Sequence, residues 1–142
     1  KEALREVNLL DFVEKSGGLD FVLLEKASNL SGGQKQRLSL ARALLHDTPI
    51  YIFDEATSNV DVESENDIMA VVRKLAKTKT VLLISHRLAN VVSADQIYVL
   101  KDGMIVEKGQ HEALCKEDGY YHRLFRQQSA LEQFGKGAVA NE

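Results

Sequence analysis

Two short apolar runs, separated by a stretch with helical periodicity, constrain the fold of this chain more than any other feature. Ile50–Phe53 and Thr80–Ile84 are rich in β-branched and aromatic residues, and continuous apolar runs of this length are typical of strands buried in a parallel sheet. Between them the sequence predicts a helix that starts near Asp61 and buries Ile68 and Val72. A strand, a helix and a second strand in this order predict an α/β fold.

Polar residues follow each predicted strand directly. Asp54 and Glu55 come after the first strand, and Ser85-His86-Arg87 comes after the second. In an open α/β sheet with right-handed crossovers the carboxyl ends of the strands share one edge, and ligands bind there. An Asp at that edge suits magnesium through its water shell, and a neighbouring Glu suits the polarisation of a water molecule. Equally, two acids can begin a solvated loop, and a lone histidine is often a hydrogen-bonded structural residue.

A serine and two glycines stand at the start of another predicted helix. This helix is expected to run from Gly32 to about His46, before the only proline, Pro49. The first N–H groups of a helix lack partners within it and favour an anion, and glycines let a phosphate approach closely. Ser31 can also serve simply as the N-cap, with the glycines forming a turn, so the local pattern leaves both interpretations open.

Periodicity and turn chemistry predict further elements on both sides of this unit. Asp-Gly between two β-rich runs is a strong hairpin signal, because both residues tolerate positive φ. The expected elements are a helix over 1–15 ended by Ser16-Gly17-Gly18, hairpin strands over 96–100 and 104–107 around Asp102-Gly103, helices near 110–116 and 119–128, and a flexible tail over 135–142.

Composition excludes several classes of protein. The 142 residues carry a net charge of −3 with scattered Lys and Arg, so no basic surface for nucleic acid is expected. Cys115 is the only cysteine, which excludes an intramolecular disulfide or a Cys-based zinc site and fits a reducing, cytoplasmic setting. The apolar stretches are no longer than strands, so we expect no membrane-spanning segment in this chain.

Three motifs occur in an order that resembles the ATPase domain of ABC transporters. Leu30–Arg37 resembles the signature motif, Tyr51–Ser58 resembles the Walker B strand, and Ser85–Leu88 resembles the switch-histidine loop. The resemblance continues through Gly109–Leu114 and Gly119–Leu124, which look like the end of an exporter-type domain. It covers nearly everything up to about residue 128.

The resemblance implies a partial P-loop NTPase fold of the ABC type. Residues 1–46 would form part of the helical subdomain with the signature helix. Residues 47–134 would form the C-terminal part of the parallel-sheet core with the C-terminal helices, and 135–142 would be the flexible tail.

The resemblance also implies how the signature residues act. In this family two nucleotide-binding domains sandwich two ATP molecules, and the signature of one domain completes the phosphate site of the other. Ser31, Gly33 and Gln34 would contact the γ-phosphate of ATP held by the opposite subunit, and Gly32 belongs to the same nucleotide-binding set.

Catalytic roles follow from the other motifs in the same way. Asp54 would hold magnesium through water, Glu55 would act as the general base on the attacking water, and His86 would contact the γ-phosphate. Asp61 matches the aspartate of the D-loop, which links the two sites across the dimer. These roles fit phosphoryl transfer, which depends mainly on positioning and charge neutralisation.

The family's Walker A motif does not occur in the 142 residues. No Gly-x-x-x-x-Gly-Lys-Ser/Thr run is present, so the phosphate-cradling Walker A loop is missing. We therefore expect the chain to be the C-terminal part of the domain and to be inactive toward ATP when alone. An unpaired strand edge would then be exposed, which predicts self-association of the isolated chain.

The function implied by the resemblance is to form part of the ATP-hydrolysing domain or subunit that powers solute transport by an ABC exporter. The implied partners are a second nucleotide-binding domain, the transmembrane domain, and ATP with Mg²⁺, at the cytoplasmic face of the cell membrane. Two alternatives stay open: a non-catalytic interaction fragment that cannot bind ATP alone, and a soluble ABC ATPase of DNA repair or translation. The exporter-like run His86–Ala89 disfavours the last.

Overall fold

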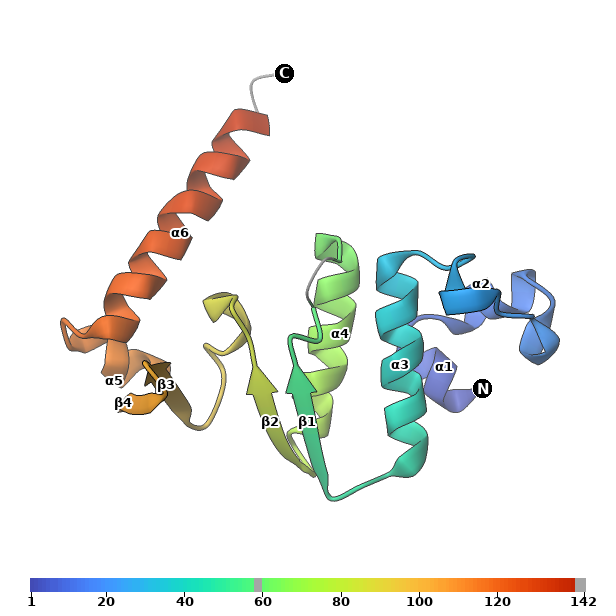
Figure 1. Ribbon diagram of the computed structural model, residues 1–142, viewed down its shortest axis with the longest axis horizontal. Coiled ribbons are helices and arrows are strands. Elements are labelled where there is room, and N and C mark those ends of the chain that lie inside the picture. The colour runs from blue at the N-terminus through green and yellow to red at the C-terminus, as the bar shows by residue number, and fades with distance from the viewer. Residues whose placement is uncertain (58–59, 140–142) are drawn as a thin grey trace. The chain divides into compact units, whose positions relative to one another are not determined.

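The structure, a computed structural model, describes residues 1–57 and 60–139, with side chains as far as Leu131. The chain divides into two compact units, Lys1–Ile84 and Ser85–Glu142. Each unit contains helices and strands (Figure 1) and has its own buried apolar cluster.

Two short helices, α1 (Glu2–Glu6) and α2 (Leu10–Lys15), open the first unit. The prediction of one continuous helix over 1–15 is wrong, because Asn8 adopts a φ of 53° and breaks it. Tertiary hydrogen bonds hold this break: the Asn8 side chain donates to Asp67 Oδ1 over 2.9 Å, and the Asn8 carbonyl accepts from Arg37 Nη1 over 3.0 Å.

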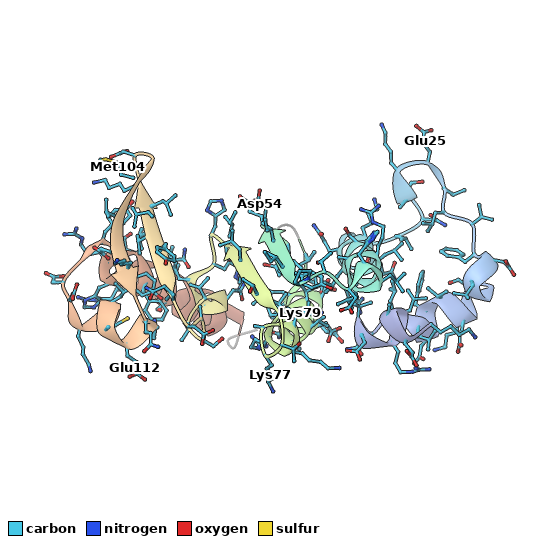
Figure 2. All side chains as sticks on the ribbon, turned by 90° about the horizontal axis from the view of Figure 1, so that it is seen from below. Glu25, Asp54, Lys77, Lys79, Met104 and Glu112 are labelled. Atoms are coloured by element: carbon cyan, nitrogen blue, oxygen red, sulfur yellow. The ribbon has the colours of Figure 1, made fainter. Side chains whose placement is uncertain are left out.

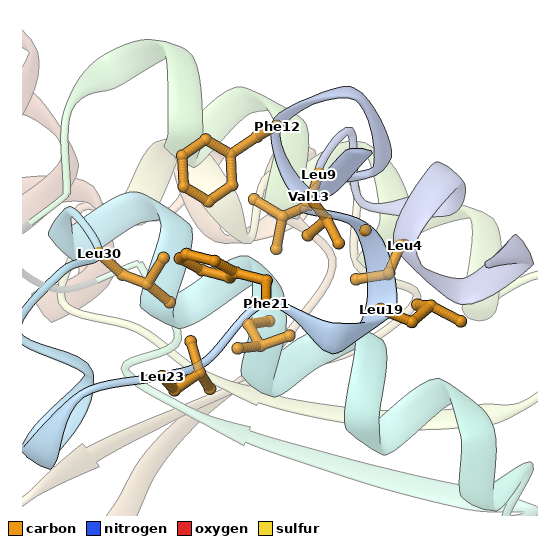
Figure 3. A pocket seen from close by; sticks show the side chains of 10 residues that line it. Leu4, Leu9, Phe12, Val13, Leu19, Phe21, Leu23 and Leu30 are labelled. Atoms are coloured by element: carbon orange, nitrogen blue, oxygen red, sulfur yellow. The ribbon is translucent and has the colours of Figure 1, made fainter. Parts of the chain in front are cut away.

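Two 3₁₀ turns, η1 (Gly18–Asp20) and η2 (Glu25–Ala27), follow α2. Gly17 and Gly18 have φ values of 114° and 76°, so the predicted helix stop is confirmed by a backbone conformation that favours glycine. An apolar pocket lies beside this segment (Figure 3). Its lining residues are Leu4, Leu9, Phe12, Val13, Gly18, Leu19, Phe21, Leu23, Leu30 and Leu38.

Helices α3 (Gly32–His46) and α4 (Val62–Leu75) confirm two predictions from the sequence. Each begins at a side-chain N-cap, Ser31 for α3 and Asp61 for α4, which satisfies backbone N–H groups that the helix itself cannot. The two helices lie side by side in Figure 1 and contact each other.

The strands β1 (Ile50–Asp54) and β2 (Thr80–Ile84) pair in parallel, with Ile50 opposite Thr80 and Asp54 opposite Ile84. Asp54 therefore lies at the carboxyl end of the pair, and Lys79 lies at the opposite end (Figure 2). The sequence predicts that both strands are buried, and the structure buries only alternate residues of β1. Tyr51 and Phe53 are buried, whereas the alternate residues Ile50 and Ile52 are 58% and 66% exposed.

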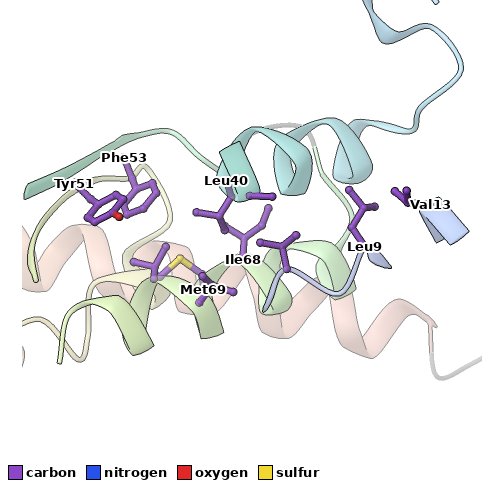
Figure 4. Close-up of a cluster of buried hydrophobic side chains, with 11 residues drawn as sticks. Leu9, Val13, Leu40, Tyr51, Phe53, Ile68 and Met69 are labelled. Carbon is purple, nitrogen blue, oxygen red and sulfur yellow. The ribbon is translucent and has the colours of Figure 1, made fainter. Parts of the chain in front are cut away.

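The core of the first unit lies between the helices and the buried face of β1. In Figure 4, Leu40 of α3 and Ile68 of α4 point toward each other, while the rings of Tyr51 and Phe53 stack with centroids 6.1 Å apart. Leu9 and other apolar residues of the N-terminal segment complete this cluster. The packing fixes the starts of α3 and α4 and the end of β1, which carry the predicted site residues other than His86.

The second unit contains η3 (Leu88–Asn90), a hairpin of β3 (Ile97–Lys101) and β4 (Met104–Gly109), and the helices α5 (His111–Lys116) and α6 (Tyr120–Val139). The hairpin is confirmed, and its turn residues Asp102 and Gly103 have φ values of 50° and 76°. The core of the second unit is formed by Ile97, Val99, Leu114 and Tyr121.

Helix α6 starts where Glu107 of β4 caps it, an interaction that no local sequence signal indicates. The Glu107 carboxylate accepts from the N–H groups of Tyr120 and, over 2.9 Å, Tyr121. The helix extends past the predicted range 119–128 to Val139, so regular structure covers residues 135–139 of the segment expected to be a flexible tail. Residues 140–142 lie outside the described residues, and the flexibility of the tail stays a prediction.

Candidate functional site

The start of α3 is built by reciprocal hydrogen bonds between Ser31 and Gln34. Ser31 Oγ accepts from the Gln34 N–H over 3.2 Å, and Gln34 Oε1 accepts from the Ser31 N–H over 2.9 Å. Ser31 and Gly32 are exposed, and Gln34 is half-buried. Ser31 is therefore the N-cap of α3, which is one of the two roles that the sequence left open. The first turn that it caps belongs to a 15-residue helix, whose dipole favours an anion.

Gly33 is buried where α3 crosses the start of α4. A Cβ atom built on Gly33 would lie 2.7 Å from Ser64 Cβ, with Ser64 Oγ closer still, and 3.3 Å from Asp61 Oδ2. Any side chain at this position would therefore push the two helices apart. The structure brings together Gly33 and Asp61, two predicted site residues, and it does so through Ser64, which the sequence did not single out.

The Asp61 carboxylate is held by two hydrogen bonds from one residue. Oδ1 accepts from the Ser64 N–H and Oδ2 accepts from Ser64 Oγ, each over 2.8 Å. The backbone N–H of Ser64 is the main reason why the pKa of Asp61 lies below its usual value, because it stabilises the charged form. Asp61 is therefore an ionised, oriented carboxylate at neutral pH.

Arg37 ties this part of the unit together, and sequence reasoning missed it. Its Nη1 donates to Asp67 Oδ2 over 3.2 Å and to the Asn8 carbonyl over 3.0 Å. The side chains of Arg37 and Asp67 are only 17% and 26% exposed, so solvent screens this pair less than a surface salt bridge. The contact joins α3, α4 and the break between α1 and α2.

Asp54 and Glu55 lie at the carboxyl end of β1, and both are exposed. The Glu55 N–H donates to the Ile84 carbonyl over 3.0 Å, which ties the turn after β1 to the end of β2. Glu55 has a φ of 49°, an uncommon conformation for a residue with a side chain. Such conformations concentrate at functional sites, where surrounding structure maintains them.

His86 is exposed and belongs to the second unit, so its predicted meeting with Asp54 and Glu55 stays a prediction. The backbone around His86 is held on both sides. Ser85 Oγ accepts from the Arg87 N–H over 3.0 Å and donates to the Arg87 carbonyl over 3.1 Å. The Gln128 side chain of α6 bonds the His86 carbonyl and the Leu88 N–H.

Comparison with known proteins identifies the family. A family model described as ABC transporter matches residues 2–58. An uncharacterized ABC transporter ATP-binding protein of Haemophilus influenzae is 53% identical over 137 residues, which are 96% of this chain and 24% of that protein. The chain belongs to the ABC transporter family. Membership implies, in general, the use of ATP with Mg²⁺.

Two further ABC proteins narrow the resemblance to exporters. An ATP-dependent lipid A-core flippase of Vibrio vulnificus (strain YJ016) is 46% identical over 138 residues, 96% of this chain and 23% of the flippase. A solved bacterial Atm1-family ABC exporter with ATP bound matches with a TM-score of 0.81 and 37% identity, over 89% of this chain and 22% of the exporter chain. The predictions of an exporter-type ABC nucleotide-binding domain and of a partial ABC ATPase fold are confirmed.

This chain spans about a quarter of the length of the curated relatives that it matches. Within the part of the chain that the structure describes, no helix is long and apolar enough to cross a membrane.

Proposed function

We propose that this chain is part of the ATP-hydrolysing domain that powers solute transport by an ABC exporter. The observation that carries the proposal is the 37% identity and TM-score of 0.81 over 89% of the chain with an exporter that has ATP bound. Residues 1–46 would form part of the helical subdomain with the signature helix, and 47–134 would form the C-terminal part of the core.

The end of β1 supplies the carboxylates of the proposed chemistry. Asp54 would hold Mg²⁺ through water. An exposed carboxylate at the end of β1 suits Mg²⁺, which keeps several waters and is bound by one or two carboxylates together with phosphate oxygens. Bound Mg²⁺ supplies neutralisation of phosphate charge.

Glu55 would act as the general base on the attacking water, because its carboxylate is exposed beside Asp54 and its backbone is fixed to β2. His86 would donate a hydrogen bond to the γ-phosphate from the loop that follows β2. The positions of these groups before reaction matter because phosphoryl transfer is accelerated mainly by orientation and charge stabilisation.

The start of α3 would bind the γ-phosphate of ATP held by a second nucleotide-binding domain, through Ser31, Gly32, Gly33 and Gln34. In the N-cap, Ser31 Oγ is the acceptor for the Gln34 N–H. The hydroxyl hydrogen is then the group that would face a phosphate oxygen. Asp61 would link the two ATP sites across that dimer, since Ser64 hydrogen-bonds its carboxylate and Gly33 leaves room for it beside the signature helix.

The remaining partners follow from the exporter proposal. The transmembrane domain would place this chain at the cytoplasmic face of the cell membrane. The polypeptide 1–142 alone would not hydrolyse ATP, because it contains no Walker A sequence.

Glu55→Gln in the complete exporter tests the proposal. The variant should bind ATP and form the closed dimer, while hydrolysis falls to background, because the amide cannot accept a proton from water. Glu63→Gln, which removes an exposed acid from the first turn of α4, is the matched control and should keep normal turnover. Undiminished hydrolysis by Glu55→Gln would refute the role of Glu55, and Mg²⁺-dependent hydrolysis by polypeptide 1–142 would refute its predicted inactivity.

A further inference from the structure

The side chain of Gln128 bonds the backbone on both sides of His86. Its Nε2 donates to the His86 carbonyl over 2.6 Å, and its Oε1 accepts from the Leu88 N–H over 2.9 Å. Gln128 lies on α6, 42 residues after His86 in the sequence. A residue of the C-terminal helix therefore holds the loop that carries the histidine.

Two other interactions make this contact a defined one. Ser85 Oγ bridges the N–H and the carbonyl of Arg87, which fixes the turn locally. Leu88 packs, partly buried, against the core of the second unit. With Gln128 added, hydrogen bonds or packing restrain the backbone both at His86 and after it, while the His86 side chain is exposed.

Only a primary amide can form both hydrogen bonds of this contact. One group must donate to a carbonyl and accept from an N–H at the same time, and among side chains of this length glutamine supplies both functions. A glutamate keeps the acceptor for Leu88 but places a negative oxygen against the His86 carbonyl. An alanine removes both hydrogen bonds.

We propose that Gln128 is a positioning residue for His86, through which α6 sets the orientation of the switch loop. The proposal rests on the role given to His86 under Proposed function. By fixing the peptide groups next to His86, Gln128 limits the directions in which the imidazole points. Displacement of a reacting group by roughly 1 Å can lower a rate by about 100-fold, so loss of this contact should reduce turnover without removing any group that touches ATP.

Amide hydrogen exchange in the 142-residue chain tests the contact independently of catalysis. Gln128→Ala should raise the exchange rate of the Leu88 amide by about 10-fold or more, because the amide loses its acceptor. Gln128→Glu should keep Leu88 protected. Gln127→Ala, at the exposed neighbouring position on α6, is the matched control and should change nothing.

The amides of the β3–β4 hairpin report whether the second unit stays folded in these variants. If Gln128→Ala also loosens the hairpin, Gln128→Glu decides the question, because it keeps the length and the acceptor of the side chain. An unchanged Leu88 amide in Gln128→Ala, or full loss of its protection in Gln128→Glu with an intact hairpin, would overturn the contact.

Turnover by the complete exporter tests the catalytic consequence. Gln128→Ala should lower kcat by about 10- to 100-fold, leave KM for ATP within about twofold, and add no further loss in a His86→Ala background. Equal losses in both backgrounds, or an unchanged kcat, would overturn the positioning role. Full turnover by His86→Ala alone would instead refute the role of His86 under Proposed function, and with it the positioning role of Gln128. The amide-exchange experiment would still decide whether the contact between Gln128 and the His86 loop exists.

Discussion

Gly33→Ala tests whether the contact between α3 and α4 requires the absence of a side chain. The new Cβ atom would lie 2.7 Å from Ser64 Cβ, whereas carbon atoms in contact are normally about 3.5–4.0 Å apart. The helices must therefore separate by roughly 1 Å, because Ser64 Cβ is fixed to the backbone of α4 and cannot rotate away.

The size of the effect follows from two opposing contributions. Overpacking by one methyl group costs about 1–3 kcal/mol, and replacement of glycine by alanine in a helix returns at most about 1 kcal/mol. We expect a net loss of about 1–2 kcal/mol in the free energy of unfolding. The loss should disappear in a Ser64→Gly background, where the opposing Cβ is absent.

Urea unfolding of the chain, followed by circular dichroism, measures this coupling as a double-mutant cycle. Ser64→Ala is the matched control, because it removes Oγ but keeps the Cβ atom, so it should relieve only the part of the strain that Oγ causes. Equal destabilisation by Gly33→Ala in the wild-type and Ser64→Gly backgrounds would refute the packing argument. In the complete exporter, a double variant that regains stability but turns over ATP more slowly than Ser64→Gly alone would separate a phosphate-binding role of Gly33 from its packing role.

Two further predictions concern the second unit and the exposed sheet face. Burial raises the pKa of Tyr121 to about 12 from an ordinary value of 10.0. The stability that Tyr121 contributes is therefore complete below pH 10 and is lost as the pH rises toward 12. Tyr121→Phe should abolish this part of the alkaline loss of stability, and a pH profile of the urea midpoint identical to that of the wild type would contradict it. The exposed apolar face of β1 and β2 predicts self-association of polypeptide 1–142. Sedimentation equilibrium should show weaker association for Ile52→Lys than for the control Val22→Lys. A wild-type chain that stays monomeric at high concentration would contradict the prediction.

Local sequence signals determined the elements that depend on neighbours along the chain. The helix from Gly32 to His46 follows from its N-cap and periodicity, and the turn at Asp102-Gly103 follows from residues that tolerate positive φ. The strand–helix–strand order likewise follows from the periodicity of hydrophobic residues along the sequence. The motifs within these elements also indicated the ABC family, because they lie at the helix start and strand ends that local patterns predict.

Only the tertiary structure decided how these elements hold one another. The break at Asn8 depends on Arg37 and Asp67, which lie 29 and 59 residues away, and the His86 loop depends on Gln128, 42 residues away. No local pattern shows which distant donor meets which acceptor, or that Gly33 faces Ser64. The exposed face of Ile50 and Ile52 has the same origin: an apolar run predicts a strand, but what covers each face depends on the packing of other segments.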